Sequence, residues 1–204
     1  MEICQIKKNN QSEIIRKAIV VLKQGKLIVY PTETCYGLGA DATNKQAVDQ
    51  FWRFKENRRR KPVLIAVATI TMAKKYGHIN NRARKIFTKY LPGPVAIVVK
   101  GRHKVDHRIE SEKGTLGIRQ PDYPLILKII QQFGQPITST SANPDNQEPP
   151  YSIGQFLRQN SQKDLISLFI DAGTLQQNIP STIVDTTKEK IKILRRGPIK
   201  IQIH

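Results

Sequence analysis

Short apolar runs alternate along the chain with amphipathic segments, and this alternation restricts the possible fold more than any other feature. The runs "KLIVY" at 26–30, "PVLIAVA" at 62–68 and "PVAIVVK" at 94–100 have the length and β-branched content of buried strands. Residues 13–24 carry apolar side chains at helical spacing, and Gly25 follows as a C-terminal stop. Buried strands separated by amphipathic helices predict a layered α/β domain.

The rest of the chain continues this pattern. Ser12 and Asp122 are expected to cap helices, and Gly134 to end one. Several strands follow each other without a helix between them, so the sheet is expected to be mixed, in one domain over 1–204. Further helices are expected at 44–55, 70–76, 80–90, 123–133 and 151–159, and strands at 115–119, 136–140, 167–173, 181–186 and 191–196.

The chain is strongly basic. It has 34 Lys and Arg against 16 Asp and Glu, which gives a net charge of +18. An excess of this size favours polyanionic partners, either nucleic acid or phosphorylated ligands, although a lysine-rich proteome would also produce it. The charge is concentrated in "FKENRRRKP", "KGRHKVDHR" and "RRGPIK", whereas a plain solvated face would spread it more evenly.

The sequence indicates a cytoplasmic protein. No apolar run approaches the roughly 20 residues of a membrane span, and the first residues lack the apolar core of a signal peptide. Cys4 and Cys35 have no metal-ligand spacing and are expected to be reduced thiols.

Polar segments follow the predicted strands, where ligands bind in α/β proteins. They are "PTETCYGLG" at 31–39, "SANPDNQEPP" at 141–150, and "PSTIVD" at 180–185 together with the later "LRRGP". Each places Ser, Thr or Asn beside Gly or Pro, which suits hydroxyls and backbone N–H groups that hold phosphate or carboxylate oxygens. Any one of them could be an ordinary turn, but their repetition after strands favours a ligand site.

Familiar signatures of other sites are missing or fail in context. The chain has no Walker motif and no G-x-S-x-G elbow, and its four histidines do not have zinc-ligand spacing. The series Gly37-x-Gly39-x-x-Ala42 fits a dinucleotide fingerprint only superficially, because residues 31–36 separate it from the preceding strand.

Eight ordered blocks resemble the YrdC-like domain family, whose members are threonylcarbamoyl-AMP synthases. The resemblance covers about residues 13–199 and implies a twisted mixed sheet flanked by helices, with a concave basic face. It implies a nucleotidyltransferase that forms threonylcarbamoyl-AMP and pyrophosphate from L-threonine, bicarbonate and ATP. The blocks are "LIVYPTETCYGLGADAT", "FKENRRRKPVLIAV", "LPGPVAIVV", "LGIRQPDYPL", "PITSTSAN", "DAG", "PSTIVD" and "ILRRGPI".

The resemblance also implies the partners of such an enzyme. Mg²⁺ is expected with the ATP, and the product would supply a downstream complex that transfers the threonylcarbamoyl group to tRNA. Because the chain ends soon after "LRRGPIK", the single-domain form is expected. A carbamoyl-transfer module is disfavoured, because it needs extensions that this chain is too short to hold.

Residue roles follow from the matched blocks. No side chain is expected to act as a covalent nucleophile or acid–base catalyst. One departure is Asn57, which stands where the family's K-x-R element has arginine, and Arg58 could supply the missing guanidinium. The resemblance assigns threonine binding to Thr34, Arg119 and Ser181, and ATP binding to Lys55, Arg58, Thr115, Ser139, Ser141, Asn143 and Arg195.

Other residues of the first polar segment are given supporting roles. Thr32 is expected to shape the loop, Glu33 to fix it as an acceptor, and Tyr36 to line the cleft wall. Cys35 is expected to pack, and the glycines to let the backbone pass close.

One alternative function remains open at this point. A non-catalytic member of the family would use its basic concave face to bind double-stranded or structured RNA. The charge of +18 suits such a protein, and so does Asn57.

Overall fold

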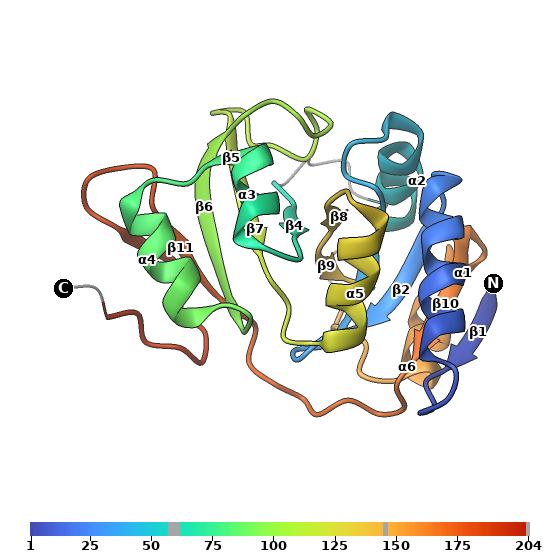
Figure 1. Cartoon of the computed structure of the whole chain (residues 1–204). Coiled ribbons are helices and arrows are strands. Elements are labelled where there is room, and N and C mark those ends of the chain that lie inside the picture. Colours follow the sequence, from blue (N-terminus) through green and yellow to red (C-terminus); the bar gives the residue numbers. More distant parts are fainter. Residues whose placement is uncertain (57–61, 145–146, 203–204) are drawn as a thin grey trace.

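The computed structural model describes residues 1–56, 62–144 and 147–202 (Figure 1). Within these residues, two mixed β-sheets lie side by side, where the sequence predicted a single mixed sheet. The first sheet has the order β1 (Glu2–Gln5), β10 (Ile166–Asp171), β2 (Leu27–Pro31), β3 (Tyr36–Gly39) and β9 (Thr140–Ser141). The second has the order β12 (Lys192–Arg195), β11 (Thr182–Asp185), β6 (Val95–Gly101), β7 (Thr115–Arg119), β4 (Leu64–Ala66) and β8 (Ile137–Thr138), with β5 (Gly77–His78) also paired to β6.

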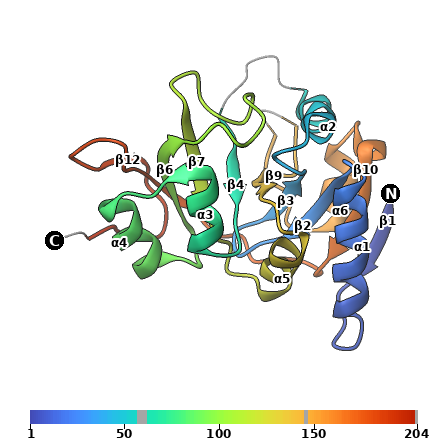
Figure 2. The same cartoon turned by 45° about the horizontal axis from the view of Figure 1, so that its top comes forward.

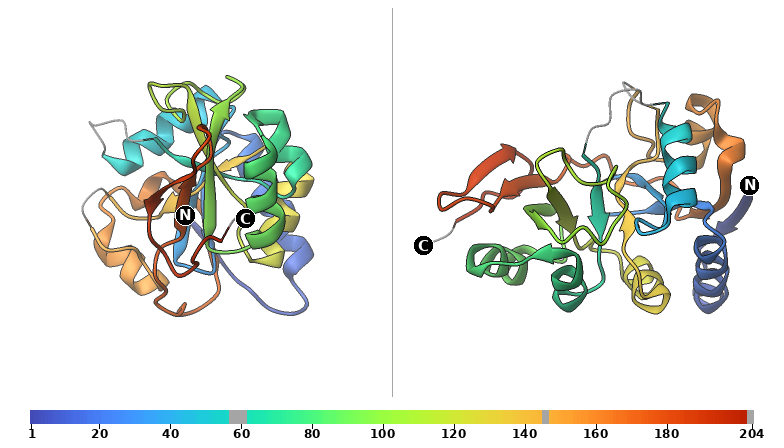
Figure 3. Two further views of the ribbon diagram at one scale, coloured as in Figure 1. Left: turned by 90° about the vertical axis from the view of Figure 1, so that its left-hand side faces the viewer. Right: turned by 90° about the horizontal axis from the view of Figure 1, so that it is seen from above.

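Helices cover both sides of the sheets. Figure 3, in its view from above, shows one row on one side that contains α1 (Gln11–Lys23), α5 (Pro124–Phe133), α3 (Ile70–Tyr76) and α4 (Asn81–Tyr90). On the other side lie α2 (Lys45–Lys55) and α6 (Ile153–Gln159), with a short 3₁₀ turn at Lys163–Leu165. None of the helices in the described ranges is long and apolar enough to cross a membrane.

An aromatic cluster holds α2 and α6 against the first sheet. The ring centroids of Phe54 and Phe156 are 6.2 Å apart, and those of Phe156 and Phe169 are 5.2 Å apart. All three side chains are fully buried, so each contributes on the order of 2 kcal/mol through removal of apolar surface from water. This packing fixes α2, which ends at Lys55, one of the predicted ATP ligands.

The segment predicted as one strand at 136–140 instead joins the two sheets. Its first half, β8, pairs with β4 of the second sheet, and its second half, β9, pairs with β3 of the first. Thr138 stabilises the crossing, because its Oγ1 donates to the Leu38 carbonyl at 2.9 Å and accepts from the Ala40 amide at 3.0 Å. Ser139 lies at the junction itself, between β8 and β9.

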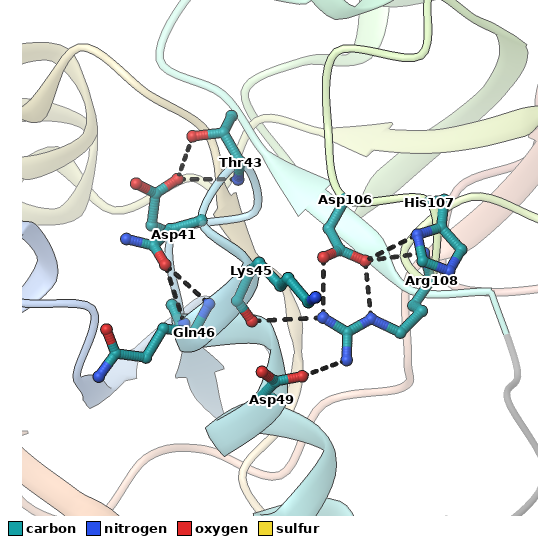
Figure 4. A network of polar contacts seen from close by, with 10 residues as sticks. Asp41, Thr43, Lys45, Gln46, Asp49, Asp106, His107 and Arg108 are labelled. Carbon is teal, nitrogen blue, oxygen red and sulfur yellow. Dashed lines mark hydrogen bonds and ion pairs between the residues drawn. The ribbon is translucent and has the colours of Figure 1, made fainter.

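The connection between β6 and β7 provides a second link between the sheets (Figure 4). Arg108 donates to both carboxylate oxygens of Asp106 at 2.8 Å, and it also contacts Asp49 and the Lys45 carbonyl on α2. Hydrogen bonding from Arg108 lowers the pKa of the Asp106 carboxyl, which stays ionised at neutral pH. This network fastens α2 of the first sheet to a loop of the second (Figure 4).

Most predicted elements are confirmed within one or two residues, but both capping predictions were wrong. Helix α1 begins at Gln11 after Asn10, so Ser12 lies inside the helix. Helix α5 begins at Pro124 with Tyr123 as its N-cap residue, one position after Asp122. Gly25 and Gly134 follow their helices with positive φ, as expected.

Three strands of the described structure were not predicted, and one of them, β5, has only two residues. Strand β1 is short and largely exposed, so it lacks the apolar run that marks a buried strand. Strand β3 lies in the segment expected to be a glycine-rich loop, yet it pairs antiparallel with β2, and its glycines lie against the Tyr30 ring. A Cβ on Gly39 would lie 2.8 Å from Ile28 Cγ1 and 3.0 Å from the Tyr30 ring, so the glycine permits the close approach that was expected.

Candidate active site

A cavity of about 320 Å³ opens where the two sheets meet, within the size range of small-molecule sites. Its walls come from the β2–β3 turn, the C-terminal end of α2, the β8–β9 junction, the end of β7, and strands β11 and β12. Seven predicted ligand residues line it: Thr34, Lys55, Arg119, Ser139, Ser141, Ser181 and Arg195.

The β2–β3 turn is built around the hydroxyl of Thr32. Its Oγ1 donates to the Cys35 carbonyl at 2.7 Å and accepts from the amides of Thr34 and Cys35 at 3.1 and 3.2 Å. These bonds close the turn and give Thr32 the loop-shaping contacts expected of it. The same oxygen lies 2.9 Å from Thr34 Oγ1, so the turn also orients the threonine that was predicted to contact substrate.

Arg119 ends β7 and forms an ion pair with Glu33. The guanidinium is buried, and within the described part of the chain its Nε has no hydrogen-bond partner. Glu33 joins three segments, because its other carboxylate oxygen accepts from the Asp122 amide and its carbonyl accepts from Asn178 Nδ2 at 2.8 Å. Arg119 therefore lies in the cavity wall paired with a carboxylate of the protein, and Glu33 is the loop-fixing acceptor that was expected.

Lys55 reaches from α2 to the backbone that follows β9. Its Nζ donates to the carbonyls of Ser141, at 3.2 Å, and Asn143. The Asn143 side chain closes its own loop by donating to the carbonyls of Pro144 and Gln147 at 3.0 and 2.6 Å. Lys55 thus fixes the loop that carries the predicted nucleotide-binding residues while it faces the cavity.

The last wall depends on a glycine that was not singled out from the sequence. Arg195 Nε donates to the Ser181 carbonyl at 2.9 Å, which holds the two predicted ligands side by side. A Cβ on Gly197 would lie 2.4 Å from both the Pro180 carbonyl oxygen and the Thr182 amide nitrogen. The glycine lets these two backbone segments pack directly together, and its place in the "LRRGP" block was the available signal.

Some predicted residues lie elsewhere. Thr115 is at the opposite end of β7 from Arg119, where its Oγ1 lies 2.7 Å from Ser111 Oγ, and it is not among the described residues that line the cavity. Asn143 is buried beside the cavity, and among the described residues its Oδ1 has no partner. Arg58 lies outside the described residues, as does Asn57.

Tyr36 does not line the cavity wall as expected. It is fully buried, and its hydroxyl donates to the Gly173 carbonyl at 2.7 Å and accepts from the Ala172 amide at 2.9 Å. Burial raises the pKa of this hydroxyl, which stays protonated. Tyr36 anchors the segment after β10, which continues to Asn178 in the cavity wall, and neither Asn178 nor the lining residue Tyr151 was predicted.

The cavity is electropositive. Its described lining contains the cations Lys55, Arg119 and Arg195 and no Asp or Glu. Partial burial and the nearby charge of Arg119 lower the pKa of the Arg195 guanidinium, a sign that these two cations lie close together. Burial raises the pKa of the Cys35 thiol, which argues for packing over nucleophilic catalysis. Clustered cations with hydroxyl donors suit a ligand that carries several anionic groups.

The residues present do not form a site for a protein-held metal ion. Among the described residues, no group of three or more His, Cys, Asp or Glu side chains could hold one.

Comparison with known proteins identifies the family. A family model named for Sua5, YciO and YrdC, and described as "Telomere recombination", matches residues 20–197. A protein of Methanocaldococcus jannaschii described as a putative threonylcarbamoyl-AMP synthase is 34% identical over 192 residues, which are 93% of this chain and 87% of the relative.

Solved structures of the same family resemble this chain over most of its length. The Pyrococcus abyssi Sua5 structure complexed with L-threonine matches with a TM-score of 0.89 and 28% identity, over 97% of this chain and 58% of that one. Escherichia coli YciO matches with a TM-score of 0.83 and 26% identity, over 97% and 96%. This chain therefore spans little more than half of the P. abyssi protein and nearly all of YciO. The predicted fold class is confirmed, and the chain belongs to the Sua5/YciO/YrdC family.

Proposed function

We propose that the chain is an L-threonylcarbamoyladenylate synthase, which forms threonylcarbamoyl-AMP and pyrophosphate from L-threonine, bicarbonate and ATP. The observation that carries the proposal is the convergence of seven predicted ligand residues, from both sheets, on one electropositive cavity. The names of the relatives support the same reaction, and the L-threonine complex of P. abyssi Sua5 supports the amino-acid substrate.

The reaction needs positioning and charge neutralisation more than acid–base chemistry. The threonine nitrogen forms a bond to the bicarbonate carbon, and water leaves. A carbamate oxygen then attacks the α-phosphorus of ATP, and the bond from that phosphorus to the bridging oxygen breaks to release pyrophosphate. Both partners in the second step are anions, so nearby cations lower the barrier by offsetting their repulsion.

The cavity residues divide between the two substrates. Arg119 would pair with the threonine carboxylate, whose planar geometry matches a guanidinium, while Thr34 and Ser181 supply hydroxyls beside it. Lys55 and Arg195 would contact the nucleotide phosphates, with Ser139, Ser141 and Asn143 on the nucleoside side. ATP would enter with Mg²⁺ bound to its phosphates. The product would supply a cytoplasmic tRNA-modifying complex.

Incubation with ATP, L-threonine and bicarbonate tests the proposal. We expect pyrophosphate and threonylcarbamoyl-AMP in equal amounts, detected by a coupled phosphate assay and by mass spectrometry. Omission of bicarbonate or L-threonine should abolish both products, which separates the reaction from ATP hydrolysis. Absence of the adenylate from a folded protein that binds structured RNA would instead support the non-catalytic alternative.

A further inference from the structure

One basic stretch of the chain contains no acidic residue, and its helices lie away from the cavity. Residues 62–105 contain nine Lys and Arg, whereas all 16 Asp and Glu of the chain lie outside this stretch. Six of the nine belong to α3 and α4, namely Lys74, Lys75, Arg82, Arg84, Lys85 and Lys89. We call the outer surface of these two helices, with those six residues, the α3–α4 face.

The α3–α4 face lies on the outside of the second sheet. Figures 2 and 3 show both helices in the row that also contains α5 and α1. Helix α4 turns Ala83, Ile86 and Phe87 inward, and α3 turns Met72 and Ala73 inward. Lys74, Lys75 and Arg84 are exposed, and no described residue of α3 or α4 lines the cavity. The face is therefore separate from the proposed active site.

The other half of the same helical row is much less basic. On α1, Lys17 is neutralised by Glu2 and Glu13, at 2.8 and 2.6 Å, which leaves Arg16 and Lys23 as the exposed cations of this helix. The exposed side of α5 presents Lys128 beside uncharged glutamines. A proteome-wide excess of lysine would raise the charge of all four helices, so a gradient within one layer points to a localised role.

The chemistry of the α3–α4 face favours phosphates over lipid or unstacked bases. The large apolar side chains exposed in the described part of the chain all lie outside α3 and α4, so this face has nothing to insert into a membrane. Tyr76 is buried, and Tyr90 is half-buried with the Lys89 ammonium 5.3 Å from its ring centroid, so neither offers a free stacking surface. Exposed Asn81 and Thr88 add neutral donors of the kind that contact phosphate and sugar oxygens.

We propose that the α3–α4 face binds the phosphate backbone of a folded or double-helical nucleic acid, at a surface distinct from the small-molecule cavity. Recognition is electrostatic and largely independent of sequence, since the face presents cations and short donors without side chains placed to read base edges. RNA and DNA offer the same backbone chemistry, and the 2′-hydroxyl distinguishes them.

Two charge-reversal variants of equal net charge test the proposal. The first is K74E/K75E/R84E, on the α3–α4 face. The second is R16E/K23E/K128E, which changes three exposed cations of α1 and α5 in the same layer. Fluorescence anisotropy measures binding of a tRNA transcript and of a DNA duplex of similar charge at several salt concentrations, and comparison of the two ligands identifies the preferred source of the backbone.

We expect the first variant to lose at least about tenfold in affinity and to show a shallower salt dependence, because each lost phosphate contact removes roughly 0.7 to 0.9 from the slope of log K against log salt. The control variant should stay within about threefold of wild type. Equal losses in both variants, or no loss in the first, would overturn the proposal, as would a wild-type protein that binds neither nucleic acid.

Three further measurements keep the result unambiguous. Formation of threonylcarbamoyl-AMP should be unchanged in the first variant, and saturating ATP with L-threonine should not displace nucleic acid from the wild type. Displacement would place the nucleic acid in the cavity and overturn the proposal. The proposal would also be overturned if the first variant bound phosphatidylserine vesicles less well than wild type but bound nucleic acid equally well. If the first variant unfolds, K74Q/K75Q/R84Q should still show a smaller loss in the same direction.

Discussion

Arg119 has two roles that a single substitution cannot separate, and a double variant separates them. The guanidinium is paired with Glu33 inside the fold, and we propose that it also binds the carboxylate of L-threonine. Arg119→Ala removes both contacts at once. R119A/E33Q removes the same guanidinium without leaving an unpaired carboxylate, so any loss that persists in it comes from the ligand contact.

The cost to folding follows from the burial of the pair. Removal of one partner from a buried ion pair costs about 3–5 kcal/mol. The Glu33 side chain is 16% exposed and keeps its contact with the Asp122 amide, so we expect a smaller loss of about 2–3 kcal/mol for Arg119→Ala. In a chain of this size, that loss lowers Tm by about 5–10 °C. The double variant should recover about half of it, because a neutral amide costs less to leave without a cation.

The effect on ligands should not recover. Loss of two charge-assisted hydrogen bonds of about 1.5 kcal/mol each raises the Kd for L-threonine by at least about 100-fold in both variants. The Kd for ATP should change by only about threefold, through the loss of one nearby positive charge. Isothermal titration calorimetry measures both ligands, and differential scanning calorimetry measures stability. Wild-type affinity for L-threonine in R119A/E33Q, or equal loss of both ligands, would refute the assignment.

Three other substitutions test different walls and the core. Lys55→Met should raise the Kd for ATP at least about tenfold by calorimetry, because the cavity loses a cation, while exposed Lys26→Met serves as the unaffected control. Gly197→Ala should lower the unfolding free energy by about 1–3 kcal/mol and weaken the binding of both ATP and L-threonine, because the added methyl group would overlap backbone atoms. Gly154→Ala on α6 is the control and should change neither, because a methyl group has room there. Burial raises the pKa of Tyr30 to about 12, whereas a tyrosine in the unfolded chain has a pKa of about 10. Unfolding between about pH 10 and pH 12 therefore releases a proton from this side chain. Stability should therefore fall by up to about 2–3 kcal/mol from pH 10 to 12, less steeply in Tyr30→Phe, as urea titrations at each pH would show; an unchanged slope would contradict the argument.

Local sequence rules located most elements because each rests on a contact within the same segment. The αL glycine after α5 is of this kind, and it lies where the pattern places it. The errors arose where a distant segment supplied the partner. The predicted strand at 136–140 divides into β8 and β9 because β8 pairs with β4 of the second sheet and β9 pairs with β3 of the first.

The candidate site depends even more than the fold on contacts between segments that are distant in the sequence. No local pattern brings Thr34, Arg119 and Ser181 together, and only the resemblance to a family predicted that they would share a site. Their convergence depends on two sheets meeting at the β8–β9 junction, and the contacts that fix this meeting are made by residues with no ligand role. Thr138 bonds to Leu38 and Ala40, in and just after β3 of the first sheet, while it pairs in the second, and Arg108 fastens the β6–β7 loop to α2.

The position of the cavity at this junction has a physical reason. Within a sheet, the backbone groups bond to each other, whereas a junction between sheets leaves turns and strand ends whose N–H groups, hydroxyls and long cations can face a common space. The proposed reaction requires two anions held against a triphosphate. A junction meets that demand by drawing Lys55 from one sheet's helix and Arg119 and Arg195 from the other sheet. The three cations still repel each other in the absence of substrate, and the ion pair between Arg119 and Glu33, together with the hydrogen bonds from Lys55 and Arg195 to backbone carbonyls, offsets part of that cost.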